Sequence, residues 1–242
     1  MTPVFCKYNF YFPPNLSQKA ATSFPLQLFL HRMRDDFIQR LAHQLQQPLP
    51  GREIQFKMAH ASRLPDLSVP ANVRQAAVLA LFYPKNENWH LVFIERDASN
   101  PKDRHGGQIS FPGGKYEEGD GTLANTALRE AQEEVGVDAA KIEILGALTD
   151  LYIPVSNFQA NPYVGFMAET PIFVPQVTEV RSILEVPFAL LQQPEVVQRI
   201  DLQLAQNLIL KQVPYFDLFG KVVWGATAMM LNELLAMMEA PV

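Results

Sequence analysis

Residues 113–137 read GGKYEEGDGTLANTALREAQEEVGV, and the second half of this stretch places acidic residues at helical spacing. Glu130, Glu133 and Glu134 lie at positions i, i+3 and i+4, so on a helix their carboxylates share one face. Neighbouring carboxylates repel one another unless a cation lies between them. Oxygen ligands are those that Mg²⁺ selects, and Mg²⁺ commonly acts by holding the phosphates of a substrate. The pattern therefore predicts a divalent metal site and phosphate chemistry.

An acidic helix face is more often simply solvated, but three further observations favour the metal site. Residues 113–136 contain six acids and two bases, a local charge of −4 out of the chain's −5. The apolar positions lie opposite the acids, so the helix is expected to pack by that side. These positions are Leu123, Ala124, Ala127, Leu128, Ala131 and Val135. At Gly113 and Gly114 no side chain obstructs the backbone, so a carbonyl there could approach an ion closely.

Residues 114–137 resemble the Nudix box, whose pattern is G-x5-E-x7-R-E-U-x-E-E-x-G-U, with U an aliphatic residue. The second half of the pattern is in register once Ala131 takes the U position. The residues that match there are Arg129, Glu130, Glu133, Glu134, Gly136 and Val137. The first half departs from the pattern, because its acid is Asp120 and eight residues, not seven, separate Asp120 from Arg129. The resemblance implies hydrolysis of a pyrophosphate linkage.

The resemblance also assigns roles to individual residues. The catalytic group that it implies consists of Arg129, Glu130, Glu133 and Glu134. Mg²⁺ or Mn²⁺ would be held by the same three glutamates and by Gly113. Arg129 lies four residues before Glu133, so an ion pair that orients this glutamate is expected. Glu179 is a candidate general base, although a solvated loop acid is the more common explanation of such a residue.

A second motif precedes the box without a gap. Residues 105–114 read HGGQISFPGG, and they follow Arg96 at the end of an apolar run. This arrangement is similar to the signature of bacterial coenzyme A pyrophosphatases, in which an Arg after a strand is followed by H-x-G-Q-x-x-F-P-G-G. By that resemblance Arg96, His105 and Gln108 bind the substrate. The basic residues Arg96, Lys102 and Arg104 are expected to supply the positive charge that binds the 3′-phosphate of coenzyme A.

Three functions are compatible with these motifs. The resemblance implies a hydrolase that cleaves coenzyme A or a derivative into 3′,5′-ADP and 4′-phosphopantetheine. A hydrolase of another nucleoside diphosphate, such as ADP-ribose, is the alternative among enzymes. A nucleotide sensor with the same fold but no catalysis is the third. Such sensors commonly lose box acids and carry a DNA-binding module, whereas here all three helix acids are present and the N-terminal region is short.

Composition agrees with a single-domain enzyme. The chain has 242 residues, of which 48% are hydrophobic, enough to bury the core of one domain. Its one cysteine, Cys6, excludes an internal disulfide and suits a reducing compartment, so a cytoplasmic location is expected. No run of 18 apolar residues occurs, which predicts no membrane partner. A pI near 5.6 disfavours nucleic acid as a partner. The expected partner is a small-molecule substrate, and a homodimer is left open.

The order of the predicted elements indicates an α+β fold. Residues 1–27 are expected to be an N-terminal extension, either a disordered tail or an upstream start-site extension, before a Nudix domain over residues 28–242 that contains the box at 113–137. Apolar spacing predicts helices over 29–45, 187–192 and 226–239, a hairpin from 76–83 and 90–95, and strands in 142–149, 163–167 and 202–216. Residues 152–162 contain two prolines and are expected to be a loop. The Nudix resemblance implies an α/β/α sandwich, with a mixed sheet between helices.

Overall fold

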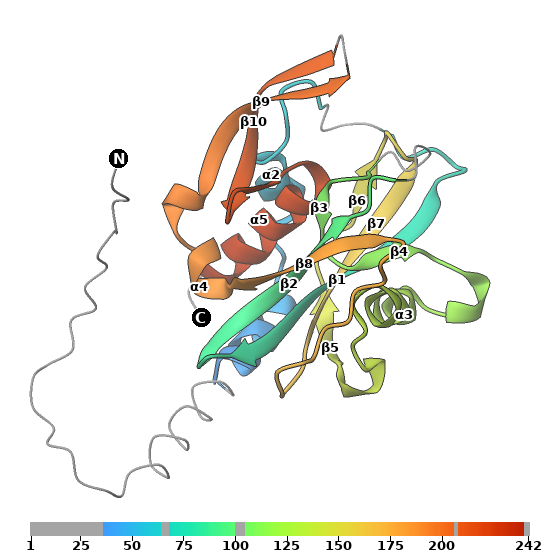
Figure 1. Cartoon of the computed structure of the whole chain (residues 1–242), viewed down its shortest axis with the longest axis vertical. Helices are drawn as coiled ribbons and strands as arrows, with labels where there is room; N and C mark the ends of the chain where they lie inside the picture. Colours follow the sequence, from blue (N-terminus) through green and yellow to red (C-terminus); the bar gives the residue numbers. More distant parts are fainter. Residues whose placement is uncertain (1–35, 64–67, 100–104, 206–207, 240–242) are drawn as a thin grey trace, which may run out of the picture.

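A mixed β-sheet with helices on both of its faces forms the centre of the computed structural model (Figure 1). The structure describes residues 36–63, 68–99, 105–205 and 208–239. The expected α+β sandwich is therefore confirmed. The expected extension over residues 1–27, and Lys102 and Arg104 of the substrate loop, lie outside the described residues. Among the described helices, none is both long and apolar enough to cross a membrane.

Eight strands form the main sheet. They are β1 Arg74–Lys85, β2 Asn88–Arg96, β3 Ile109–Ser110, β4 Gly113–Lys115, β5 Glu143–Ala147, β6 Leu151–Ile153, β7 Phe158–Phe166 and β8 Val180–Pro187. The order along the sheet is β3-β2-β1-β7-β5, with β4 paired to β1, β6 to β7 and β8 to β2. Strands β1 and β7 run parallel, whereas the hairpin partner β2 runs antiparallel to β1. The sheet is therefore mixed, as expected.

The hairpin of β1 and β2 is confirmed, with a tighter turn than the sequence predicts. Lys85 pairs with Asn88, so only Asn86 and Glu87 form the turn. Both residues have positive φ, 48° and 63°, as a two-residue type I′ turn requires. Asn tolerates this conformation well, and the right-handed twist of the turn matches that of the strands.

Both faces of the sheet are buried, because successive side chains of its central strands point to opposite sides. On one face the packed side chains include Leu79, Leu81, Val92 and Ile94, with Ala127, Ala131 and Val135 of helix α3, Leu123–Val135. On the other face Ala80, Phe82, Leu91 and Phe93 pack beneath helix α5, Gly225–Glu239. The helix over residues 36–45 packs on the α5 side through Phe37 and Leu41, as part of the predicted N-terminal helix.

Helix α2, Gly51–Phe56, was not predicted from the sequence and is fixed to α5 by a buried carboxylate. Glu233 of α5 is fully buried. Its carboxylate accepts hydrogen bonds from the backbone N–H of Gly51 (3.0 Å), the side-chain amide of Gln55 (2.7 Å) and the hydroxyl of Thr149 (2.6 Å). These donors offset the cost of burying the charge, so one side chain joins two helices and the segment that follows β5.

A second sheet lies beyond the first in the chain. Its strands are β9 Val197–Ala205, β10 Leu208–Leu218 and β11 Lys221–Val223, in the order β11-β10-β9. The short helix α4, Phe188–Leu191, precedes it with Pro187 at its N-cap, which confirms the helix predicted over residues 187–192. The β9–β10 hairpin projects from the rest of the molecule (Figure 1).

One secondary-structure prediction is wrong. Residues 152–162, expected to be a loop, form most of β6 and the first half of β7, joined by a turn at residues 154–157. Asn157 takes the left-handed conformation of that turn, with φ 52°. Pro162 lies within β7 opposite Val78 of the parallel strand, and its carbonyl accepts a hydrogen bond from Leu148 N–H at 2.8 Å. Proline lacks the N–H donor, but at this position its carbonyl still accepts a backbone hydrogen bond, and the strand continues through it.

Candidate active site

The glycine pair before the acidic helix is built into the sheet. In β4, Gly113 pairs with Val78 of β1 and Gly114 pairs with Ala77. Gly113 has φ +155°, and a Cβ on it would lie 2.4 Å from the carbonyl oxygen of Ala77. No side chain fits there, so the backbone of β4 lies close against β1. The chain then passes through the short 3₁₀ helix η1, Glu118–Asp120, into α3.

Helix α3 is fixed at both ends by local interactions. Thr122 caps its start, because the Thr122 hydroxyl accepts a hydrogen bond from Asn125 N–H at 3.2 Å. Gly136 ends the helix in the left-handed conformation, with φ 72°. The apolar side predicted from the sequence packs on the sheet through Ala127, Ala131 and Val135. The acids of the helix are thereby held at the end of the sheet that carries β4.

Glu134 is the most deeply buried acid of the predicted site, with 2% of its side chain exposed. The N–H of Gly113 donates to its Oε2 at 2.8 Å, and Nη1 of Arg96 donates to its Oε1 at 3.2 Å. Burial raises the pKa of Glu134 to about 7, although the Gly113 hydrogen bond and the charge of Arg96 oppose this rise. The charges of Glu130 and Glu179 raise the pKa further. Glu134 therefore retains a carboxylate only at a cost that a cation could offset.

Glu130 lies directly above the second glycine of β4. A Cβ on Gly114 would lie 2.5 Å from the carboxyl carbon of Glu130, so only glycine leaves room for this carboxylate. The side chain of Glu130 is 13% exposed. Burial raises its pKa, Arg129 opposes that shift, and Glu133 and Glu179 add to it. Two carboxylates thus converge on one glycine pair, and the charge of Glu130 contributes to the raised pKa of Glu134.

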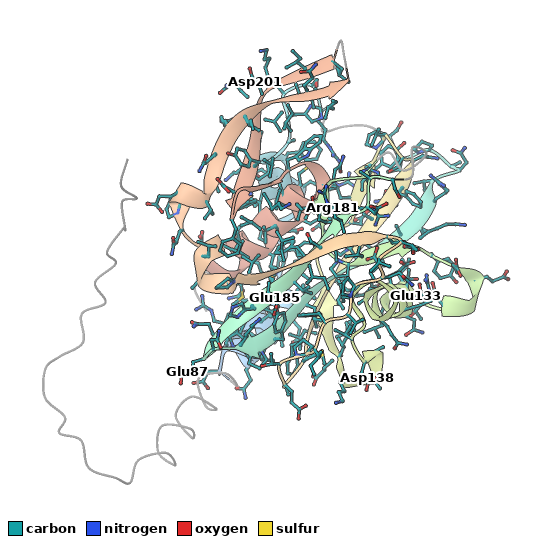
Figure 2. All side chains as sticks on the ribbon, viewed as in Figure 1. Glu87, Glu133, Asp138, Arg181, Glu185 and Asp201 are labelled. Carbon is teal, nitrogen blue, oxygen red and sulfur yellow. The ribbon has the colours of Figure 1, made fainter. Side chains whose placement is uncertain are left out.

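Glu133 is placed differently from the other two helix acids. Its side chain is 57% exposed and its Oε2 lies 2.9 Å from Nη1 of Arg129. Figure 2 shows Glu133 on the side of α3 away from the centre of the sheet. The three acids therefore do not share one face as evenly as their spacing predicts. Each residue advances the helix by about 100°, so Glu134 reaches the packed side while its neighbour Glu133 reaches solvent.

Arg129 connects the carboxylates of the box. Its Nη1 lies 2.9 Å from Glu130 Oε1 and 2.9 Å from Glu133 Oε2, as the expected ion pair with Glu133 requires. Its Nε donates to Asp120 Oδ1 at 2.7 Å, and its Nη2 donates to Asp120 Oδ2 at 3.1 Å and to the carbonyl of Lys115 at 3.0 Å. The guanidinium is thus held from several sides, which fixes its orientation.

Asp120, the box acid displaced by one residue, is the fixed partner of Arg129. It also accepts hydrogen bonds from the N–H of Glu117 at 3.0 Å and the hydroxyl of Thr126 at 2.8 Å. The hydrogen bond from Arg129 is the main reason why the pKa of Asp120 lies well below its usual value. The additional residue between the halves of the box is absorbed by η1 and the turn after it. Sequence spacing alone left the role of this acid open.

The predicted substrate loop is joined to the end of β2. Arg96 N–H donates to the carbonyl of Gln108 at 3.0 Å, and Gly107 N–H donates to the carbonyl of Arg96 at 3.0 Å. His105 Nδ1 lies 3.3 Å from Gln108 Oε1. The structure therefore brings Arg96, His105 and Gln108 together. However, the guanidinium of Arg96 contacts the carboxylate of Glu134. This position favours a role for Arg96 beside the acids over the expected role in binding a 3′-phosphate.

Glu179 reaches the acid cluster from the loop between β7 and β8. The loop is attached to the end of α3, because Val174 N–H donates to the carbonyl of Val135 at 2.9 Å and Gln176 N–H to that of Glu134 at 3.0 Å. The charge of Glu179 raises the pKa of Glu134 and of Glu130. A loop acid distant in sequence thus belongs electrostatically to the same site.

The donor set fits a divalent cation that shares its coordination with a substrate. Within the described ranges, no three His, Cys, Asp or Glu side chains form a complete metal cluster. Arg96 and Arg129 instead hold the carboxylates of Glu134 and Glu130. Mg²⁺ is usually bound through one or two carboxylates together with substrate phosphates, so a complete protein cage is not required. The hard oxygen donors and the raised pKa values of Glu130 and Glu134 agree with such an ion.

Comparison with known proteins places these features in a family. The family model of the NUDIX domain matches residues 73–202. The Uncharacterized Nudix hydrolase NudL of Pectobacterium atrosepticum is 34% identical over 176 residues, which cover 70% of this chain and 85% of the relative. The protein of the same name from Yersinia enterocolitica is 32% identical over 203 residues, covering 84% of this chain and 92% of the relative.

Among solved structures, the NUDIX domain of Shewanella oneidensis NrtR, in a cocrystal with ADP ribose, is similar at a TM-score of 0.40 and 20% identity. That similarity covers 57% of this chain and 89% of the NrtR domain. The family match includes the glycine pair, the acidic helix and Glu179. The chain therefore belongs to the Nudix hydrolases, which generally use divalent metal ions and act on small-molecule nucleotide substrates.

Proposed function

We propose that the chain hydrolyses the diphosphate bond of coenzyme A or of a derivative, giving 3′,5′-ADP and 4′-phosphopantetheine. One observation carries the proposal: a single residue, Arg96, is bonded to both halves of the site. Its backbone pairs with Gln108 and Gly107 of the loop that resembles the coenzyme A signature. Its side chain contacts Glu134 of the box. The loop expected to bind substrate is therefore held next to the carboxylates expected to act on it.

In this proposal Glu130 and Glu134 would hold Mg²⁺ or Mn²⁺, with the backbone of Gly113 and a more distant contribution from Glu133. When bound, the ion neutralises the diphosphate oxygens and makes an attacking water easier to deprotonate. Glu134 must lose its proton to serve as a ligand, and its raised pKa means that binding releases a proton near neutral pH. Metal binding and the ionisation of this acid are therefore linked.

Arg129 acts as a positioning residue in the proposed mechanism. Its guanidinium orients Glu130 and Glu133 at 2.9 Å each. Asp120 in turn fixes the guanidinium through Nε and Nη2. A ligand held in one orientation loses less entropy when the ion and the substrate bind. Arg129 therefore contributes by keeping the carboxylates in place before the substrate arrives.

Two further residues would act on the diphosphate and on the proton. Arg96 lies where a phosphate oxygen can replace Glu134 as the acceptor of its guanidinium hydrogen bond, which would neutralise charge on the substrate. Glu179 is exposed and close enough to the acids to raise their pKa values, so we assign it the role of proton acceptor for the attacking water. Both roles use groups that the fold brings to one place from distant parts of the sequence.

A substrate panel tests the proposed function. The purified chain, with Mg²⁺, is incubated separately with coenzyme A, acetyl-coenzyme A, dephospho-coenzyme A, ADP-ribose and nucleoside triphosphates, and the products are separated by chromatography. The proposal expects the coenzyme A compounds to be cleaved fastest, with 3′,5′-ADP released from coenzyme A. Faster cleavage of ADP-ribose would support the alternative and overturn the coenzyme A assignment. Glu118→Gln, an exposed acid of the same box, is the control for general effects of charge.

A further inference from the structure

Two consecutive residues at the end of β2 point to opposite sides of the sheet. Arg96 reaches Glu134 on the α3 side, whereas Glu95 lies on the side of α5 and the second sheet. The side chain of Glu95 is only 10% exposed. Its Oε2 accepts hydrogen bonds from Lys221 Nζ at 2.8 Å and from the hydroxyl of Ser182 at 2.7 Å. Glu95 is therefore a buried anchor for a cation that comes from another part of the chain.

A second cation reaches the same carboxylate. Nη1 of Arg181 lies 3.7 Å from Glu95 Oε1. Arg181 is the additional residue of a bulge, because Ser182 pairs with Glu95 while Val180 pairs with Arg96. Figure 2 shows Arg181 where the main sheet meets the part of the molecule that contains β9, β10 and α5. Two positive side chains thus surround one inward-facing carboxylate.

The two cations are more exposed to solvent than the carboxylate that they contact. The side chains of Arg181 and Lys221 are 67% and 43% exposed, whereas that of Glu95 is 10% exposed. Among the residues that the structure describes, Asp97 is a further acid close to Arg181, and its carboxylate accepts hydrogen bonds from the N–H and the hydroxyl of Ser99 within its own loop. The carboxylate of Glu95 therefore lies inside, whereas the two cations that contact it face outward and are accessible to a ligand.

This pair of exposed cations lies next to the predicted substrate loop. Glu95 pairs with Ile109 of β3, directly after Gln108. Strand β11, which carries Lys221, packs against β3. Lys221 also lies outside residues 73–202, the part of the chain matched by the NUDIX family model. The C-terminal second sheet thus places a cation beside the strand that follows the predicted substrate loop, and this cation lies outside the matched domain.

We propose that Lys221, assisted by Arg181, binds the 3′-phosphate of the substrate and so selects nucleotides that carry a phosphate on the ribose. The inference rests on the proposed function for the identity of the full substrate. A phosphate monoester carries about −1.5 to −2 charges near pH 7 and accepts several hydrogen bonds. The ammonium of Lys221 has three donors and gives one to Glu95, so two remain for a phosphate while Glu95 keeps the side chain in place. Arg96, beside Glu134, is left to act at the diphosphate.

The test compares substrates with and without the 3′-phosphate. Lys221→Gln removes the charge but keeps an amide that can donate to Glu95, and Lys221→Arg keeps the charge. For Lys221→Gln we expect kcat/KM to fall about tenfold or more with coenzyme A and less than about twofold with dephospho-coenzyme A. Lys221→Arg should retain most of the preference. Equal losses on the two substrates, as a purely structural tether would give, would overturn the inference.

A matched control and a second variant keep the test decisive. Lys211 is an exposed lysine of the same sheet whose Nζ lies 2.8 Å from Asp201. Figure 2 shows Asp201 towards the far end of the hairpin, away from Arg181. Lys211→Gln should therefore change neither substrate. If Lys221→Gln is poorly folded by its melting curve, Arg181→Gln replaces it, and a selective loss with coenzyme A is again expected; an unselective one again overturns the inference.

Binding without turnover separates this inference from the proposed function. Calorimetry measures the affinity of the wild-type chain for adenosine 3′,5′-bisphosphate and for AMP. Tighter binding of the bisphosphate, lost in Lys221→Gln, supports the role of Lys221 even if coenzyme A is not cleaved, in which case only the proposed function fails. Equal affinities for the two nucleotides overturn the role of Lys221 while leaving hydrolysis of coenzyme A to be judged by its own assay.

Discussion

The carboxylate of Glu130 occupies the space that a side chain at residue 114 would need. A Cβ on Gly114 would lie 2.5 Å from Cδ and 2.5 Å from Oε2 of Glu130. Gly113 lies just as close to the backbone of β1, so the two glycines make room for different parts of the structure. Gly113 allows β4 to approach the sheet, and Gly114 allows the acid to approach β4. The carboxylate of Glu130 therefore lies directly against a stretch of backbone that carries no side chain.

Gly114→Ala should therefore impair catalysis more than folding. The new methyl group must displace Glu130, so we expect kcat to fall by about tenfold or more and the Mg²⁺ concentration for half-maximal rate to rise. Gly119→Ala is the matched control, because a Cβ at Gly119 meets nothing within 4 Å. Rates measured over a Mg²⁺ titration decide the matter. Equal behaviour of the two alanine variants would contradict the placement of Glu130.

Charge on the two buried glutamates should be essential. Glu134→Gln and Glu130→Gln keep the size of the side chain and remove the charge, so each should lower kcat by about 10²-fold or more. Near pH 7 the melting temperature should change little, because relieved repulsion between the ionised acids offsets the lost contacts with Arg96 or Arg129. Glu118→Gln should retain nearly the full rate. Near wild-type rates for both buried variants would show that these carboxylates do not hold the ion.

The raised pKa of Glu134 predicts a specific pH dependence of stability. An acid with a pKa of about 7 in the folded chain and 4.5 when unperturbed binds an additional proton on folding between these values. In metal-free protein this contribution is complete below pH 4.5 and is lost as the pH rises towards 7. Its size is on the order of 3 kcal/mol, at 1.36 kcal/mol per pKa unit.

Denaturant unfolding of the metal-free wild type and of Glu134→Gln between pH 4.5 and 7.5 measures this contribution. The difference in unfolding free energy between the two proteins should shift steadily in favour of the variant as the pH rises. Addition of Mg²⁺ should stabilise the wild type most at the upper end of the pH range, because Glu134 is ionised there and has no metal ion to neutralise its charge. Parallel pH profiles would rule out the raised pKa.

Arg96 should act at the diphosphate. The sequence alone favoured Arg96 as the residue that reads the 3′-phosphate, but its guanidinium lies 3.2 Å from Glu134. Arg96→Ala should therefore lower kcat/KM for coenzyme A and dephospho-coenzyme A by similar factors, each about tenfold or more. Steady-state rates on the two substrates provide the measurement. A loss confined to coenzyme A would assign binding of the 3′-phosphate to Arg96 rather than to Lys221.

Local patterns predicted most of the fold because they depend on neighbours in sequence. The hairpin turn at Asn86, the packed side of α3 and helix α5 all follow from spacing and turn chemistry. The strand over residues 158–162 was missed, because its partners in β1 lie far away in sequence and outweigh the turn signal of Pro162. Strand β8 was missed for the same reason, since β2 supplies its pairing.

The candidate site shows the same difference between features that depend on neighbours in sequence and features that depend on distant contacts. The acids of the box were predicted from their helical spacing and from the resemblance, but their different burial was not. Glu133 is exposed and Glu134 is buried because one residue rotates the helix surface from solvent to the sheet. The hydrogen bonds of Asp120 depend on the path of η1, which spacing does not reveal. Lys221 carries no local signal at all, since only the pairing of distant strands brings it to Glu95.

The most direct test of the account is a competition assay in one vessel. Coenzyme A and ADP-ribose are supplied at equal concentration with Mg²⁺, and their disappearance and products are followed by chromatography, before and after excess EDTA and again after Mg²⁺ is restored. We predict that coenzyme A is consumed at least about tenfold faster, yields 3′,5′-ADP and 4′-phosphopantetheine, stops with EDTA and resumes with Mg²⁺. Preferential loss of ADP-ribose, or undiminished cleavage of coenzyme A in EDTA, would contradict the account.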